Sequence, residues 1–513
     1  MTRVLLVMMC AGMIAGGVLI YEHHRQLKEL AHRREAGAAQ AELEEKVAGI
    51  LSGMEEMSNA MAASIGALQA EFSGMTARVE RADVTATRLM ELAEKNLRAR
   101  EATLRAQQRG AARRVATAPT ARTDSVPRRR KGGPVYTDDL SEWPNNVSKA
   151  NSDEWIVEHH QKLRVMKPRL LVINFAKKMP RSEVRKATEQ LIKALEESSK
   201  WHGYAENSPA FLRYEVWRYV DCNDCPVKAS NQWLDYDKLY TQAYAKYWGM
   251  KDADNSERYL TLSELVDEGY VHELWMFFDP NDKIGMFESI EWKPVYDEQF
   301  KRKEGEYRMA GNGGDPDVRW TGRSLRFTCL NKDRGIGCGM ENLAHAIEGT
   351  SNSGCIPYFT KYFREYAMLN LRERYGVPFD SLYETKMEQQ QIRYLNRSTA
   401  EVMFQGARYV ITNYVVAGGN VHFPPNARQH YDMRNITPVM STIENWRMGN
   451  GAGGADKAEP WTSSRIPRSY HTIAPDCMGA WIIYWRQNMP GLDNRARDDE
   501  GKPMLNWWPF LFY

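Results

Sequence analysis

Leu170-Leu-Val-Ile-Asn-Phe175 is the stretch that decides the fold class, because a short apolar run of this length is typical of a buried strand. Runs of similar character recur further along the chain, at residues 211–220, 271–278 and 324–329. Helical patterns separate some of these runs, at residues 182–199 and 262–268. Strands that alternate with helices predict an α/β body whose sheet is mostly parallel and flanked by helices.

The predicted sheet also indicates where a ligand would bind. In open α/β sheets, ligands lie beyond the carboxyl ends of the strands. Polar segments follow two of the predicted strands, at residues 279–282 and 331–334. We therefore expect a binding site at that edge of the sheet.

The first quarter of the chain differs sharply from the rest. Residues 1–134 carry 21 Lys and Arg against 15 Asp and Glu, whereas residues 135–513 carry 48 against 51. All 15 Trp lie in residues 135–513, and the only aromatic residues before them are Tyr21 and Phe72. Because aromatic side chains dominate cores, we predict a globular body over residues 135–513 only. The small net charge of the chain, +3, excludes a nucleic-acid binder driven by bulk charge.

The front end is predicted to hold a membrane anchor. Residues 4–20 contain no charge, and as a helix they would span about 26 Å, just short of the bilayer core of about 30 Å. We therefore interpret residues 1–24 as a single-pass anchor, with a cleaved signal sequence as the alternative. The basic residues that follow the anchor favour a cytoplasmic body. The features of the body described below favour an extracellular or lumenal one.

A long helical stalk is predicted over residues 25–109. Apolar residues recur there every seven positions, which is the pattern of a self-associating coiled coil, and so a homo-oligomer is expected. The positions are Val47, Met54, Met61, Leu68 and Met75. A single solvated amphipathic helix is the alternative. Residues 110–134 are rich in Arg and read as a basic linker, with a protease site or a contact with anionic lipid or polysaccharide as alternatives.

The body carries two signs of an oxidising compartment. It contains six cysteines, which permit three disulfides without fixing any. It also contains three Asn-x-Ser/Thr sequons, at Asn146, Asn396 and Asn435. Together with the anchor and stalk, these features lead us to expect an extracellular or lumenal body.

The strongest candidate for chemistry is a helical pattern over residues 340–348. Glu341, His345 and Glu348 stand at positions i, i+4 and i+7, which places all three on one helix face. Two carboxylates and an imidazole suit a divalent metal such as zinc. His422, in a loop stiffened by two prolines, is a candidate fourth ligand. The alternative is a helix whose polar face carries an ordinary Glu-His-Glu cluster.

An ordered series of motifs in the body resembles an uncharacterised family of secreted proteins, largely bacterial. The motifs are Leu170–Phe175, Tyr259–Trp275, Gly285–Ser289, Glu341–Glu348, Val421–Asn426 with Tyr431-Asp432, and Asn506-Trp-Trp508. In that family the helix motif tends to read Glu-x-x-Gly-His-x-x-Glu, and this chain departs from it at Ala344. The resemblance transfers no activity, but it supports a metal site and implies that Glu288 lies near the same cleft. Glu288 is our candidate for a catalytic base.

Three functions follow from these patterns. The first is a membrane-tethered extracytoplasmic protein with a metal-dependent hydrolase-like site, acting on a glycan or a peptide. The second is a lumenal glycosyltransferase, because Asp315-Pro-Asp317 has the D-x-D form that such enzymes use to hold a metal. The third is a non-catalytic surface or scaffold protein that binds a partner or glycan, and it predicts that His422 lies far from Glu341 and His345. Trp481, Trp485, Trp507 and Trp508 are read as core residues, with a sugar-stacking platform as the alternative.

Overall fold

The computed structural model describes residues 133–148, 153–279, 284–313, 315, 317–331, 333–386, 389–449 and 456–513. These residues all fall within one compact unit. The predicted anchor at residues 4–20, the stalk and nearly all of the basic linker lie outside the described residues. Among the described residues, no helix combines the length and the apolar character needed to cross a bilayer.

The body has mixed α/β content, as predicted. Its helices are α3 (Asp153–His159), α4 (Arg181–Ser198), α5 (Gln242–Trp248), α6 (Leu262–Asp267), α7 (Ile336–Asn352), α8 (Pro357–Tyr366), α9 (Leu371–Tyr375), α10 (Arg468–Ile473) and α11 (Gly479–Gln487). Its strands are β1 (Glu142–Trp143), β2 (Val165–Met166), β3 (Arg169–Asn174), β4 (Glu215–Asp221), β5 (Glu273–Phe278), β6 (Ser289–Tyr296), β7 (Arg302–Gly311), β8 (Arg326–Asn331), β9 (Ile392–Asn396), β10 (Thr399–Phe404), β11 (Ala407–Thr412), β12 (Val439–Ser441) and β13 (Glu459–Trp461).

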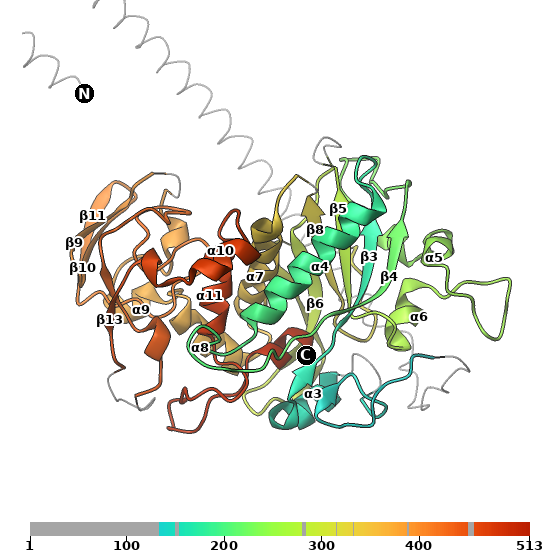
Figure 1. Cartoon of the computed structure of the whole chain (residues 1–513), viewed down its shortest axis with the longest axis horizontal. Helices are drawn as coiled ribbons and strands as arrows, with labels where there is room; N and C mark the ends of the chain where they lie inside the picture. Colours follow the sequence, from blue (N-terminus) through green and yellow to red (C-terminus); the bar gives the residue numbers. More distant parts are fainter. Residues whose placement is uncertain are drawn as a thin grey trace, which may run out of the picture. The chain divides into compact units, whose positions relative to one another are not determined.

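The central sheet has six strands in the order β4-β3-β5-β8-β6-β7 (Figure 1). Strands β4, β3, β5 and β8 run parallel to one another, and they correspond to the four strands predicted from sequence. The prediction of a mostly parallel sheet is wrong, because β6 is antiparallel to both of its neighbours, β8 and β7. Only residues 297–301 connect β6 to β7, and so short a connection permits a hairpin but no parallel crossover.

Helices cover both faces of this sheet. Side chains alternate along its strands, so each strand contributes to a core on each face. Leu170 and Val172 of β3 belong to a large core together with residues of α4, α7 and α11. Leu171 and Ile173 point the other way, into a smaller core with residues of α5 and α6. Figure 1 shows α4 in front of the strands, with α7 and α11 beside it.

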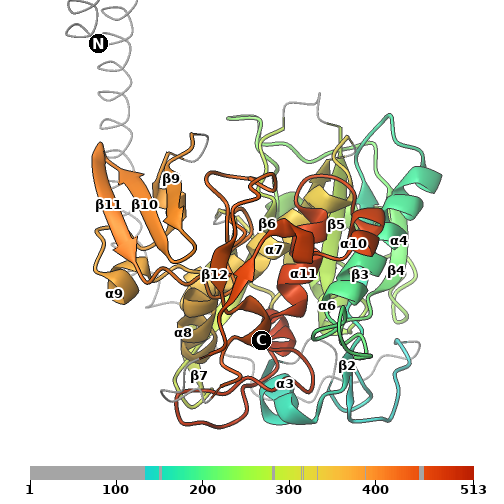
Figure 2. The same cartoon turned by 60° about the vertical axis from the view of Figure 1, so that its left-hand side comes forward.

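The second half of the body extends the large core. It contains the antiparallel sheet β11-β10-β9, the pair β12-β13 and helices α8 and α9, which lie beside the central sheet in Figures 1 and 2. The four tryptophans near the C-terminus are all buried in this core, at 2 % exposure or less, which confirms the core interpretation. They are Trp481, Trp485, Trp507 and Trp508.

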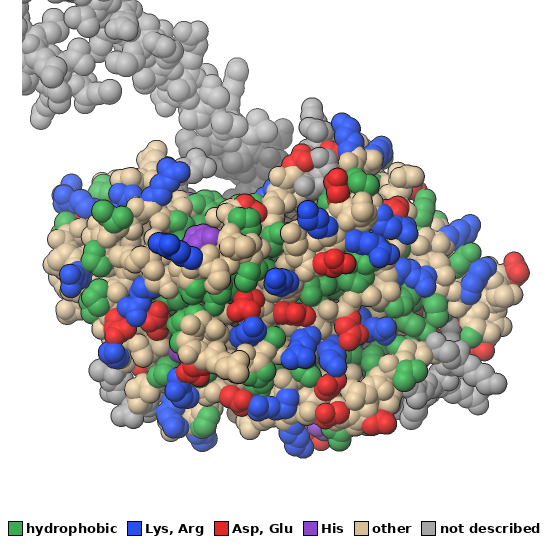
Figure 3. All heavy atoms as spheres, viewed as in Figure 1, with side chains coloured by type: hydrophobic (Ala, Val, Ile, Leu, Met, Phe, Trp, Pro, Cys, Tyr) green, Lys and Arg blue, Asp and Glu red, His purple; other side chains and the backbone are tan. Residues whose placement is uncertain are grey.

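Charged side chains of both signs are interspersed over the face of the body seen in Figure 3. Inside the body, a buried ion network ties the sheet to the C-terminal residues. Arg326 on β8 pairs with Glu273 of β5 at 2.6 Å and with Glu291 of β6 at 2.7 Å. It also donates to the carbonyl of Leu511 at 2.8 Å. Each charge in this network has a partner of opposite charge, and this attraction offsets the desolvation penalty of its burial.

Candidate metal centre

Helix α7 carries the candidate site and is almost wholly buried between its neighbours. It follows β8 after four residues and packs against α4, α8 and α11. Glycine is required in its first turn, since a Cβ on Gly337 would come within 1.8 Å of the Asp476 carbonyl oxygen. Ala344, where the resembling family has glycine, is itself fully buried in the large core. The helix is therefore fixed on several sides, and so are the polar groups it presents.

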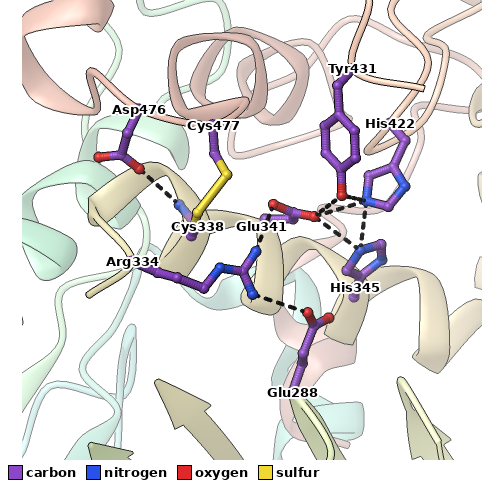
Figure 4. The surroundings of a disulfide bond; sticks show 9 residues. All are labelled: Glu288, Arg334, Cys338, Glu341, His345, His422, Tyr431, Asp476 and Cys477. Carbon is purple, nitrogen blue, oxygen red and sulfur yellow. Dashed lines mark hydrogen bonds and ion pairs between the residues drawn. A yellow bond between two sulfur atoms is a disulfide. The ribbon is translucent and has the colours of Figure 1, made fainter. Parts of the chain in front are cut away.

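A disulfide fixes the start of α7 to the segment before α11. Cys338 and Cys477 are joined across 139 residues of sequence, with their Cα atoms 5.6 Å apart. The Asp476 carboxylate accepts a hydrogen bond from the backbone N–H of Cys338 at 3.2 Å (Figure 4). Of the six cysteines of the body, these two form the pair, while Cys222, Cys329 and Cys355 are buried thiols.

The loop that carries His422 is folded onto α7 by polar contacts. The side-chain oxygen of Asn420 accepts from the backbone N–H groups of His422 at 3.2 Å and Phe423 at 3.0 Å. The backbone N–H of Val421 donates to the Glu348 carboxylate at 3.2 Å. These contacts place His422 against the face of α7 that carries Glu341 and His345.

Three side chains converge there on one point (Figure 4). His422 Nε2 lies 2.9 Å from Glu341 Oε1 and 3.1 Å from His345 Nε2, and the His345 and Glu341 atoms are 3.9 Å apart. These three separations average about 3.3 Å, close to the roughly 3.4 Å between neighbouring ligand atoms of a tetrahedral zinc site with bonds of about 2.1 Å. Among the described residues, Cys338, Asp476 and Cys477 also lie close together, but the two cysteines are joined in the disulfide and offer no thiolate to an ion.

Glu348 lies outside that group, one layer further from the convergence point. Its Oε2 is 3.0 Å from Nδ1 of His345, and Tyr383 donates to its Oε1 at 3.1 Å. A carboxylate at Nδ1 keeps the proton there and turns the lone pair of Nε2 toward the centre. The residue predicted as a ligand is thus placed to orient a ligand.

Tyr431 and His430 complete the surroundings of His422. The Tyr431 hydroxyl donates to Glu341 Oε1 at 2.6 Å and lies 3.0 Å from His422 Nε2. The ring of His430 packs edge-on against that of His422, with centroids 4.6 Å apart. Burial lowers the pKa of His430 to about 4, so this ring is neutral at neutral pH.

The electrostatics of the cluster favour a cation. Burial alone would raise the pKa of Glu341, but hydrogen bonds from His345, His422 and Tyr431 outweigh it and hold that pKa well below its usual value. Burial would lower the pKa of His345, but its contacts with Glu341 and Glu348 raise it to about 10. In the metal-free protein a proton therefore balances the buried carboxylates. A divalent cation would compete with it for the same nitrogen.

Glu288 lies near the cluster, as the resemblance implied, and Arg334 connects the two. Arg334 contacts Glu288 Oε1 and Glu341 Oε2, each at 3.4 Å, and Asn312 donates to Glu288 Oε2 at 2.7 Å. The antiparallel direction of β6 explains this position. Its start, next to Glu288, lies at the sheet edge where the parallel strands β5 and β8 end.

A cavity of about 210 Å³ opens at that same edge. Its polar lining includes Asp279 after β5, Asn331 at the end of β8, Arg334 and Glu288. This is the edge at which the sequence predicts ligand binding. Residues 280–283 lie outside the described residues.

Asp315 and Asp317, the candidate D-x-D pair, are held by an ion pair. Lys228 Nζ lies 2.8 Å from the Asp315 carboxylate and 2.6 Å from that of Asp317. The lysine supplies the positive charge that a metal would otherwise bring. The contacts with Lys228 therefore account for both carboxylates without a metal.

Comparisons with known proteins add no further assignment. The chain matches no protein-family model, no curated protein and no solved structure. Its function must therefore be inferred from the site itself.

Proposed function

We propose that the body of this protein is a metal-dependent hydrolase in which Glu341, His345 and His422 bind a divalent ion such as zinc. The observation that carries the proposal is the convergence of one oxygen and two nitrogens at ion-binding distance. Two histidines and one glutamate leave a coordination position open, which is typical of catalytic zinc sites. The scaffold hypothesis expected His422 to lie far from this helix, and that expectation is wrong.

The open position gives the site its chemistry. A bound divalent metal lowers the pKa of its water to about 7, so that hydroxide is available at neutral pH. Glu288 would take the proton of the attacking water. Arg334 and Asn312 would hold the Glu288 carboxylate in place. Glu348 and Tyr383 would keep His345 oriented.

The cavity beside Arg334 is the proposed substrate site. It borders the cluster through Arg334, which contacts the candidate ligand Glu341. Its polar groups and its apolar wall of Phe278, Ile284 and Leu330 suit one unit of a glycan or a peptide. Both substrate classes remain within the proposal.

The Cys338–Cys477 disulfide supports a location outside the cytoplasm, since such bonds persist in oxidising compartments. We propose that residues 4–20 anchor the chain in a membrane and that the stalk joins copies of it. The alternative glycosyltransferase function gains no support from Asp315 and Asp317, which pair with Lys228.

Metal analysis of the purified full-length protein tests the proposal. We expect about one zinc per chain, its loss in a His345→Ala variant, and metal-dependent hydrolysis of the generic ester p-nitrophenyl acetate. Removal of the ion with a chelator should abolish this hydrolysis and added zinc should restore it. A metal-free protein with unchanged content in His345→Ala would refute the proposal.

A further inference from the structure

The hydroxyl of Tyr431 lies beside the candidate metal ligands. It is 2.6 Å from Glu341 Oε1 and 3.0 Å from His422 Nε2, so it touches two of the three candidate ligand atoms (Figure 4). In a tetrahedral site with bonds of about 2.1 Å, neighbouring ligand atoms are about 3.4 Å apart. The phenolic oxygen is near enough to belong to that set.

The backbone of Tyr431 is held in an unusual conformation that directs this hydroxyl inward. Its φ of 59° lies in the left-handed region, which aromatic residues rarely adopt. The Tyr431 N–H donates to the carbonyl of His422 at 3.1 Å, which joins the two backbones. Strain of this kind persists where the surroundings impose it, and it clusters at functional sites.

The ring of Tyr431 is not part of the core. The residue is 45 % exposed, although its hydroxyl contacts Glu341 and His422. The ring packs on one side against His422, with centroids 4.4 Å apart. A side chain with one solvent-exposed face has room to swing away from the site, which a core side chain would not have.

We infer that Tyr431, as its phenolate, is the fourth protein ligand of the ion in the resting protein. Its proton passes to solvent when the ion binds, and Tyr431 takes a proton back from solvent when it leaves to admit water and substrate. This inference rests on the proposed metal site and adds a gate to it. The phenolic oxygen closes the open coordination position, and its departure exposes that position. Tyr431 is thus both a ligand and the group that controls access.

Copper substitution tests the inference directly, because a copper-bound tyrosine phenolate gives a tyrosine-to-copper charge-transfer band in the visible spectrum. The full-length protein would be loaded with Cu²⁺ and compared with Tyr431→Phe, which keeps the ring against His422. Tyr409→Phe is the matched control, since Tyr409 lies on strand β11, outside the candidate site. Resonance Raman spectra of the unmodified protein identify bound tyrosine without any variant.

We expect the band in the unmodified protein and in Tyr409→Phe, and its loss in Tyr431→Phe. Copper affinity of Tyr431→Phe should fall by at least the roughly 10–100-fold typical of losing an outer-shell partner. Copper bound without the band, or a band unchanged in Tyr431→Phe, would overturn the inference and leave the metal site standing. No copper binding by the unmodified protein would overturn both.

Discussion

The two glutamates of α7 occupy different positions around His345 and should behave differently when changed. Glu341 faces the convergence point, whereas Glu348 contacts the far nitrogen of His345. Glu341→Gln should abolish stoichiometric zinc binding. Glu348→Gln should keep one zinc per chain with about 10–100-fold lower affinity. Titration against a chromophoric chelator measures both, and the reverse order would contradict these assignments.

Glu288 should matter for turnover and not for metal content. Glu288→Gln is expected to retain its zinc and to lower kcat on p-nitrophenyl acetate by about 10²–10⁴-fold, the usual contribution of a general base. Asp317→Asn is the matched control, because Asp317 pairs with Lys228 away from the cluster. Equal activity of Glu288→Gln and Asp317→Asn would remove Glu288 from the mechanism.

Part of the site could be predicted from single residues. Helical spacing put Glu341 and His345 on one face, and a rigid loop suggested His422. Spacing could not say which imidazole nitrogen meets which carboxylate, so Glu348 was expected among the ligands. The sequence does not indicate His430 and Tyr383, because they reach the site through loop packing, which leaves no periodic signal. Tyr431 belongs to one of the sequence motifs, but no spacing pattern connects it with α7.

At the level of elements, the strands with strong apolar runs were the predictable ones. The expected strand at 170–175 and helix at 182–199 agree with β3 and α4 to within a residue. Strands β6 and β7 were missed for physical reasons. β6 contains Pro294, which argues against a central strand, and β7 is a largely exposed edge strand rich in charge. Missing this hairpin led to the wrong expectation of a mostly parallel sheet.

The disulfide should stabilise the junction between α7 and α11. A link that closes 139 residues restricts the unfolded chain, and its removal should cost about 2–5 kcal/mol of unfolding free energy. A Cys338→Ser/Cys477→Ser double variant should unfold at lower denaturant concentration than the unmodified protein. Cys355→Ser, which changes a buried thiol that forms no disulfide, is the control. A double variant as stable as the unmodified protein would contradict the structural role.

The three sequons are not equally available in the folded protein. Asn435 is buried and donates to the Asn426 carbonyl at 2.6 Å, and Asn146 donates to the carbonyl of Tyr136 at 3.0 Å. Asn396 is exposed at the end of β9. If the body is lumenal in a host that glycosylates, we expect one glycan, at Asn396. Glycosidase digestion should shift the mobility of the protein but not that of Asn396→Gln, and a shift that persists in this variant would contradict the assignment.

At the scale of the whole molecule, buried histidines should make the body sensitive to acid. His160 accepts a hydrogen bond from Tyr513 and contacts the Asn506 carbonyl at 2.7 Å, which ties α3 and the following turn to the C-terminus. Burial lowers the pKa of His160 to about 4, from 6.5 for an exposed histidine. Between these values the unfolded chain binds more protons, so stability is full above pH 6.5 and falls toward pH 4.

The size of this effect follows from the shift, roughly 3 kcal/mol for His160 over that window. His202, whose pKa burial also lowers to about 4, adds to it in the same direction. Denaturant unfolding at several pH values measures how the unfolding free energy changes with pH. Between pH 6.5 and pH 4, this free energy should fall less steeply for His160→Gln than for the unmodified protein. Parallel slopes would show that His160 does not titrate in this way.

The composition of the chain as a whole misrepresents its parts. The net charge of +3 sums a basic front end and a slightly acidic body, and only the body contains the material for a core. Both cores and the candidate site lie among the described residues of the body. The anchor and the stalk stay predictions.

The central claim is that one ion binds between Glu341, His345 and His422. Anomalous diffraction from crystals of the zinc-loaded protein, recorded on both sides of the zinc absorption edge, tests it most directly. We predict a single strong peak bonded to Glu341 Oε1 and to the Nε2 atoms of His345 and His422. An empty position there, or a zinc peak only elsewhere in the body, would contradict the account.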